Sequence, residues 1–261
     1  MTGSSLAKAR VRIGKLSIDV VDFAGAIDAI DRLIAEKNGG TVFTPNVDHV
    51  VMAEHDERFR AAYAEAALSL VDGTPVLWAS RLLRTPLPEK ISGSDLALPL
   101  MQRAAERGHR VFFLGGAPGV AELAKSKLEQ ALPTIQIVGT DASRIDVNAA
   151  PSDSELVRRI NLTRPDLVMV ALGAPKQEIW SHLYSQALKP AVLVGVGASL
   201  DFVAGVQSRA PRWMSRAGLE WLYRLGQEPR RLAARYLLRD PEFCLILARQ
   251  LLLRSKRAEL P

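Results

Sequence analysis

The segment RVFFLGGAPGVAELAKSKLEQA, residues 110–131, decides the fold of this chain. Residues 111–114 of this segment form an apolar block without polar alternation, which predicts a strand that is covered on both faces. A glycine-rich turn follows, and the remaining residues repeat apolar side chains at helical spacing. The same order recurs along residues 11–196, which predicts a mostly parallel sheet wrapped by helices. We therefore predict an α/β, Rossmann-like fold.

The repeated pattern also gives the elements of this fold. The predicted strands cover residues 11–20, 41–45, 68–71, 110–114, 135–139, 166–171 and 191–196. The predicted helices cover residues 23–37, 47–66, 74–84, 94–107, 118–131, 152–163 and 176–187.

The pattern changes after about residue 205. Residues 206–261 contain no strand candidate and interleave arginines with apolar residues, which predicts two or three amphipathic helices. The chain has 34 Lys+Arg and 28 Asp+Glu, a net charge of +6. Residues 209–261 carry 12 Lys+Arg and 5 Asp+Glu, so the excess positive charge lies in this tail. We predict a Rossmann-like core over residues 1–205 and a basic helical appendage over residues 206–261.

The composition limits the class of protein. With 261 residues, 48% apolar and 24% charged, the chain can bury a large core, which excludes disordered and fibrous proteins. No secretory signal and no bilayer-length apolar run is present, so we expect a cytoplasmic protein. We expect Cys244, the only cysteine, to be a small buried apolar residue. The four histidines are scattered, without HxxxH, HExxH or DxD spacing, and the sequence predicts no metal site.

Polar residues follow two of the predicted strands, at the edge where parallel sheets bind ligands. Asp72 comes directly after strand 68–71, where a carboxylate can take a proton from an acceptor hydroxyl. Thr44 and Asn46 bring a hydroxyl and an amide to the end of strand 41–45. Each also has a structural explanation, because Asp-Gly is an ordinary turn, Asp72 can cap helix 74–84, and Asn46 can cap helix 47–66.

Two further loops offer groups that suit a phosphate. Gly115, Gly116 and Gly119 lead from a strand into a helix, an arrangement in which backbone N–H groups can bind a phosphate. Alternatively, the three glycines only permit a tight turn. Their spacing matches neither GxGxxG nor a P-loop.

The loop after strand 166–171 begins with Gly173. Lys176 or the helix N-terminus can hold phosphate, and Gln177 can bind a hydroxyl or a carbonyl. Glu178 can contribute to this site or act only as a favourable charge in the first turn of the helix. We predict that these four loops and a fifth, Gly195-Val196-Gly197-Ala198, converge on one cleft.

The tail suits three roles. Its arginines and aromatic residues can lie on an anionic membrane, close over a diphosphate, or form the solvated face of a helical extension. It contains no nucleic-acid recognition motif, and we expect no nucleic-acid partner.

Taken together, these segments resemble the WecG/TagA/CpsF family of bacterial glycosyltransferases over roughly residues 11–240. The resemblance rests on TPNVDHVVMA, LVDGTPVLWASRLL, ISGSDL, VFFLGGAPGVAE, PDLVMVALGAPKQEIW, DFVAG, RAPRWM and GLEWLYRLGQEPRRLAARYL. It implies an inverting, metal-independent transfer from a UDP-sugar to a polyprenyl-diphosphate-linked saccharide, in cell-surface polysaccharide synthesis at the inner face of the cell membrane. The donor sugar stays open between N-acetylmannosamine, its uronic acid, glucose and glucuronic acid, and a homo-oligomer is compatible with this interpretation.

The resemblance also implies roles for particular residues. Asp72 matches the family's general base, and Thr44 lies with Asn46 in the same pocket. Gln177 matches a pocket residue of the GxPxQE motif. The tail residues that are candidates to reach the diphosphate are Arg212, Arg216, Arg224, Arg230 and Arg231. No cofactor is implied.

Two other classes of protein stay open from the residues alone. A nicotinamide-dependent oxidoreductase needs a GxGxxG turn with an acidic residue about 20 positions further on, and the spacing of the glycine turn argues against it. A non-catalytic membrane adaptor would use the sheet only to support the basic tail.

Overall fold

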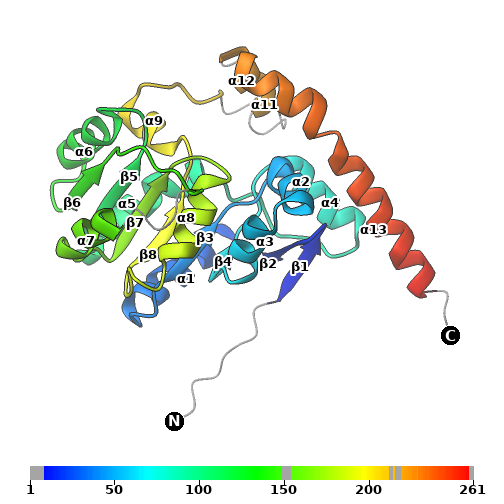
Figure 1. The fold of residues 1–261 in the computed structure, drawn as a ribbon, viewed down its shortest axis with the longest axis horizontal. Helices are drawn as coiled ribbons and strands as arrows, with labels where there is room; N and C mark the ends of the chain where they lie inside the picture. Colours follow the sequence, from blue (N-terminus) through cyan, green and yellow to red (C-terminus); the bar gives the residue numbers. More distant parts are fainter. Residues whose placement is uncertain (1–8, 149–153, 212–213, 215–218, 228, 259–261) are drawn as a thin grey trace, which may run out of the picture.

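A computed structural model of the protein, drawn in Figure 1, describes residues 9–148, 154–211, 214, 219–227 and 229–258. Six parallel strands form its central sheet in the order β4-β3-β8-β7-β5-β6. The strands are β3 (Gly40–Phe43), β4 (Leu68–Ser69), β5 (Arg110–Gly115), β6 (Gln136–Asp141), β7 (Leu167–Ala171) and β8 (Val192–Gly195). The predicted α/β fold with a parallel sheet is confirmed.

Helices cover both faces of this sheet (Figure 1). One face carries α1 (Phe23–Ala35), α5 (Gly93–Arg107), α6 (Val120–Ala131) and α9 (Ser199–Ala204). The other carries α2 (Val47–His55), α3 (Glu57–Ala64), α4 (Thr74–Leu82), α7 (Ser154–Leu162) and α8 (Lys176–Tyr184). In β5, Phe113 packs with the first group, and Phe112 and Leu114 pack with the second. This explains why the strand is apolar without alternation.

Two predicted elements are wrong in their boundaries, and one helix was not predicted. Residues 11–20 form a hairpin of β1 (Arg10–Ile13) and β2 (Leu16–Asp19), because Gly14 adopts a φ of 57° and reverses the chain. The predicted helix 47–66 is divided into α2 and α3 at Asp56, whose backbone is extended and whose side chain accepts from the Phe59 N–H. Helix α9 has no counterpart among the predicted elements.

The tail is helical, as predicted. It contains α11 (Glu220–Gln227), α12 (Pro229–Ala234), the π-helical turn η1 (Arg235–Arg239) and α13 (Glu242–Ala258). Helix α13 runs beside α2 and α4 (Figure 1), with Phe243 buried in the core that these helices share. Gln250 accepts from the Gly14 N–H (2.9 Å) and donates to the Arg12 carbonyl (2.7 Å). The tail is therefore packed onto the hairpin and α2.

The expected burial of Cys244 is wrong. Phe243 faces the core, and Cys244, the next residue along α13, is exposed to solvent. Among the described residues, no helix combines the length and the low charge that are needed to cross a bilayer.

Candidate active site

The site lies where the loops after β3 and β4 meet the tail. These two strands are neighbours in the sheet, and the Asp72 N–H donates to the Pro45 carbonyl (2.9 Å), so the two loops lie together. Between them and the tail is a cleft of about 510 Å³. Its lining residues are Asn46, Val47, Asp72, Gly73, Thr74, Pro75, Lys90, Glu220, Trp221, Arg235, Tyr236, Leu237, Asp240, Pro241, Phe243 and Cys244. We call this space the Asp72 cleft.

Asn46 has two roles in the structure. Its side chain accepts from the His49 N–H (3.3 Å), which confirms it as the N-cap of α2. It also accepts a hydrogen bond from the Arg235 guanidinium (3.1 Å), a residue of the tail. The cap residue of α2 is therefore one of the points where the core holds the tail.

Asp48 is the second such point. This carboxylate is buried in the first turn of α2 and pairs with Arg235 (3.1 Å) and Arg239 (2.6 Å) from η1. A buried carboxylate needs partners of this kind, because its desolvation is otherwise costly. The two arginines therefore hold η1 against the N-terminus of α2.

Further ion pairs join the tail to the core around the cleft. Lys90, on the segment between α4 and α5, pairs with Glu220 of α11 (3.3 Å). Arg209 pairs with Asp95 in the first turn of α5. The walls of the Asp72 cleft therefore come from both the core and the tail, which these ion pairs and the Arg235 contacts hold together.

Asp72 enters this cleft half-buried, directly after β4. The cap position of α4 is occupied by Gly73, so the alternative in which Asp72 caps this helix is wrong. A second carboxyl group, Asp240, lines the same cleft from the tail. Burial raises the pKa of Asp240 to about 6, although Arg235 partly opposes the increase. Lys90 and Arg235 bring positive charge to the same space.

A buried polar layer lies behind the cleft. The His49 Nδ1 lies 2.8 Å from the Tyr63 hydroxyl. Burial lowers the pKa of His49 to about 3, and Arg235 and Arg239 add to the decrease, so this histidine is neutral at physiological pH. Burial raises the pKa of Tyr63 well above its ordinary value, with Glu178 and Asp72 as further causes. The charges of Glu178 and Asp72 thus both act on the same hydroxyl. Thr44 is buried near the end of β3 and is not one of the residues that line the cleft.

Gln177 and Glu178 also belong to the buried part of the protein. Gln177 donates to a Glu178 carboxyl oxygen (2.8 Å) and accepts from the Gly197 N–H (3.0 Å). Gly195 leaves room for this arrangement, because a Cβ there would lie 3.1 Å from the Gln177 amide nitrogen. Burial raises the pKa of Glu178 to about 7, while the hydrogen bond from Gln177 opposes the increase. Glu178 is therefore not a solvated charge in the first turn of α8.

The pKa of Glu178 predicts a dependence of stability on pH. Between its ordinary value of 4.5 and its folded value of about 7, the folded state binds the extra proton, so stability falls as the pH rises through this range. Glu178→Gln removes this titration and keeps an acceptor for Gln177. From pH 5 to pH 8, we expect the wild type to lose roughly 2–3 kcal/mol more stability than the variant. Urea unfolding at several pH values measures this difference, to which the shift of His49 contributes equally in both proteins. Parallel pH profiles would contradict the shift.

The glycine turn after β5 has a structural explanation of its own. Gly115 has a φ of 95°, and a Cβ there would lie 2.6 Å from the Ala171 carbonyl oxygen. Gly116 donates to the same carbonyl (3.0 Å). None of Gly115, Gly116 and Gly119 lines the Asp72 cleft, because β8 and β7 separate β5 from β3. Gly173 and the exposed Lys176 do not line it either.

The tail arginines of the cleft are not those that the sequence predicted. Arg212 and Arg216 lie outside the described residues, as do the side chains of Arg224 and Arg231. Arg230 is exposed on α12 and does not line the cleft. The cleft instead contains Arg235 and Asp240, with Arg239 beside it, and none of these three was predicted. In the segment RYLLRD, Arg235 and Arg239 are four residues apart, which places these two arginines on one side of a helix, and Asp240 directly follows them.

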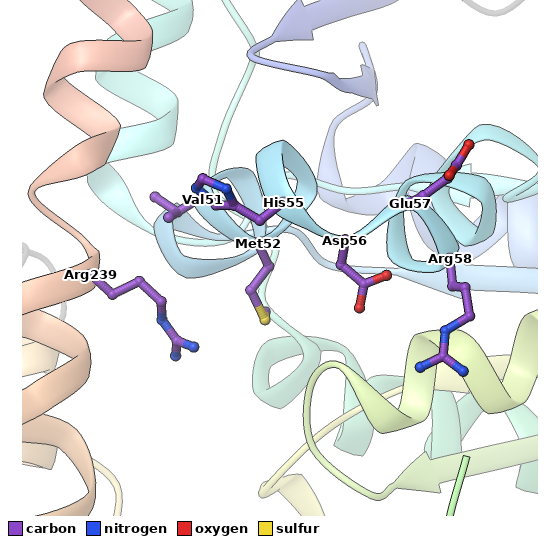
Figure 2. A pocket seen from close by; sticks show the side chains of 7 residues that line it. All are labelled: Val51, Met52, His55, Asp56, Glu57, Arg58 and Arg239. Atoms are coloured by element: carbon purple, nitrogen blue, oxygen red, sulfur yellow. The ribbon is translucent and has the colours of Figure 1, made fainter. Parts of the chain in front are cut away.

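A second hollow, of about 370 Å³, lies between Arg239 and the segment that joins α2 to α3 (Figure 2). Arg239 and Arg58 point into it from opposite sides. Both guanidinium groups have partners, because Arg239 pairs with Asp48 and Arg58 donates to the Asn148 side chain (2.7 Å). Of these two spaces, the Asp72 cleft has the larger volume and lies at the carboxyl ends of β3 and β4, where parallel sheets bind ligands. Within the described part of the chain, no three His, Cys, Asp or Glu side chains gather as metal ligands do.

Comparison with known proteins gives the class: the chain is a glycosyltransferase. It belongs to the WecG/TagA/CpsF family of glycosyl transferases, whose model matches residues 11–257. An N-acetylglucosaminyldiphosphoundecaprenol N-acetyl-beta-D-mannosaminyltransferase of Bacillus spizizenii is 34% identical over 75% of this chain and 74% of its own. The protein of the same name from Staphylococcus aureus is 31% identical over 83% of this chain and 84% of its own. The oxidoreductase and adaptor alternatives are not favoured.

Proposed function

We propose that this glycosyltransferase moves an N-acetylmannosamine-type sugar from a UDP-sugar to a polyprenyl-diphosphate-linked saccharide, with inversion and without a metal ion. The names of the relatives support this donor sugar and a lipid-diphosphate acceptor that carries N-acetylglucosamine. The observation that carries the proposal is the position of Asp72, in a cleft that also holds Lys90 and Arg235.

In the proposed reaction, Asp72 acts as the general base. Its carboxylate takes the proton of the acceptor hydroxyl, and the oxygen attacks the anomeric carbon from the side opposite the UDP. The new carbon–oxygen bond forms while the bond from the anomeric carbon to the diphosphate breaks, and UDP leaves with the electron pair. The anomeric configuration is inverted because a single displacement occurs.

The leaving UDP carries negative charge that the cleft must stabilise. Lys90 and Arg235 are the two cationic side chains among the described residues that line it, and the guanidinium suits diphosphate oxygens. Gly73 and Thr74 bring the N-terminus of α4 to the same place, where the helix dipole favours anions. Each cation has a carboxylate partner in the structure, Glu220 for Lys90 and Asp48 for Arg235, so substrate phosphate would compete with these contacts.

We propose supporting roles for the other predicted residues. Asn46 orients Arg235 at the cleft. Thr44, Gln177 and Glu178 belong to the buried layer that fixes the loops after β3, β7 and β8. Direct contact of the glycine turn, Gly173, Lys176 or the predicted tail arginines with substrate remains a prediction. We also propose residues 1–205 as the catalytic core and residues 206–261 as its appendage.

The acceptor lipid implies a membrane surface, and exposed side chains support docking at its inner face. On α13, Leu245 and Leu252 are 71% and 64% exposed, and the exposed Arg249 lies between them. On α4, Trp78 and Leu82 are also exposed, with Arg81 beside them. Apolar and basic side chains on one helix face are typical of contact with anionic lipid. We propose that this face of α4 and α13 lies on the membrane.

The proposed reaction is tested by a transfer assay with UDP-N-acetylmannosamine and an N-acetylglucosamine diphosphate acceptor on a short lipid, in the presence of EDTA. We expect the acceptor to gain one N-acetylhexosamine with inverted anomeric configuration, measured by mass spectrometry and NMR. The corresponding uronic acid, glucose and glucuronic acid donors serve as comparisons. Absence of transfer from every UDP-sugar to this acceptor by the folded protein would contradict the proposal.

A further inference from the structure

The Asp72 cleft has an unusual distribution of polarity. Among the residues that the structure describes, the exposed ones that line it are all uncharged: Pro75, Trp221, Leu237, Pro241 and Cys244. We call these five residues the apolar rim. Trp221 is 44% exposed and Leu237 is 66% exposed.

The charged residues of the cleft lie deeper than the apolar rim. The side chains of Lys90, Glu220, Arg235 and Asp240 are only 15–24% exposed, and Asp72 is half-buried. Single exposed apolar residues are normal on a protein surface, but several of them around one cleft indicate a binding site for an apolar group. A water-soluble ligand would not need these residues. An amphiphile fits this arrangement, with its charged group inside the cleft and its apolar chain leaving through the mouth.

The apolar rim also continues along α4. Pro75 lines the cleft, and the exposed Trp78 and Leu82 follow it at i+3 and i+7, on the same side of the helix. The apolar surface thus runs from the mouth of the cleft onto the face of α4 that we assign to the membrane. A chain that leaves the cleft over Pro75 would then pass Trp78 and Leu82 on its way to the bilayer.

We propose that the apolar rim binds the isoprenoid chain of the acceptor next to its diphosphate. This inference rests on the proposed function, because the lipid diphosphate acceptor comes from there. The rim contributes affinity through apolar burial, and the diphosphate reaches the cations of the cleft. Headgroup and chain are then recognised together, and a diphosphate without a chain binds more weakly.

Cys244 allows a direct test, because it is the only cysteine of the chain and lies in the apolar rim. Alkylation of its thiol by iodoacetamide, followed by mass spectrometry, reports whether the rim is covered. We expect farnesyl diphosphate to slow alkylation in a saturable way, about tenfold at ten times its dissociation constant. Inorganic diphosphate at the same concentration should leave the rate nearly unchanged. Equal protection by both compounds, or none by farnesyl diphosphate, would overturn the proposal.

A pair of variants separates the rim from general effects on the protein. Leu237→Ser should raise the half-protecting concentration of farnesyl diphosphate by about tenfold, because an apolar contact is lost. Leu162→Ser, a similarly exposed leucine on α7, should not change it. Equal values for both variants and the wild type would also overturn the proposal. Protection needs no sugar transfer, so transfer without protection would refute the rim alone, and protection without transfer would refute the proposed function alone.

Discussion

Asp72→Asn is expected to lower turnover by about 10²–10⁴-fold, the usual contribution of a general base. The amide keeps the size and the hydrogen-bonding capacity of the side chain but cannot accept the proton of the acceptor hydroxyl. The main-chain contact from Asp72 to Pro45 is unaffected, so the loops after β3 and β4 should keep their positions. Steady-state transfer with saturating donor and acceptor measures the effect, and calorimetric titration with UDP checks that the donor site is intact.

Asp240→Asn is the matched comparison for this variant. Asp240 lines the same cleft and its pKa is raised to about 6, so it is the alternative base on the tail. We expect a much smaller loss than for Asp72→Asn, because the proposed mechanism gives the proton transfer to Asp72, and Asp240 only adds negative charge 3.9 Å from Arg235. A large loss for Asp240→Asn together with a near-normal rate for Asp72→Asn would place the base on the tail.

The double variant Leu245→Ser and Leu252→Ser is expected to lower binding to anionic vesicles by at least about tenfold. The two leucines are exposed and seven residues apart on α13, and transfer of one leucine side chain out of water is worth about 1.5–3 kcal/mol. Turnover on an acceptor embedded in vesicles should fall in parallel. Turnover on a short-chain, water-soluble acceptor should not, because neither leucine lines the Asp72 cleft.

Leu162→Ser is the control for exposed leucines. Leu162 is 68% exposed on α7, which lies far from α13 in Figure 1, and its replacement should leave vesicle binding unchanged. Vesicle co-sedimentation at low and high salt measures both effects, since the contribution of the arginines is screened by salt. Normal vesicle binding by the double variant would show that α13 does not contact the membrane.

The sheet was predictable from the sequence because its strands are buried on both faces. Blocks such as residues 111–114 and 167–171 carry apolar side chains at every position, and this pattern is hard to confuse with a loop. The hairpin at residues 10–19 was missed because one glycine, Gly14, reverses the chain inside a single apolar-rich block. The break between α2 and α3 was missed because Asp56 is as compatible with a helix surface as with a cap.

Only the site residues that directly follow a strand were predictable from the sequence. Asp72 and Asn46 could be placed because each directly follows a strand, and neighbouring parallel strands end at the same edge. The partners from the tail could not be placed in this way. Arg235 meets Asn46 across 189 residues of sequence, and nothing local distinguishes it from the other arginines of the tail. Cys244 shows the same limit, since the sequence does not say which side of α13 faces the core.

We propose that Asp72 takes part in the chemical step, after the substrates are bound. A rapid-quench single turnover tests it most directly, with enzyme in excess over UDP-N-acetylmannosamine and with saturating acceptor, since this separates chemistry from product release. We expect Asp72→Asn to bind the donor as the wild type does but to form almost no glycolipid in the time in which the wild type converts all of it. Product formation at the wild-type rate, or a loss of activity explained entirely by lost donor binding, would contradict it.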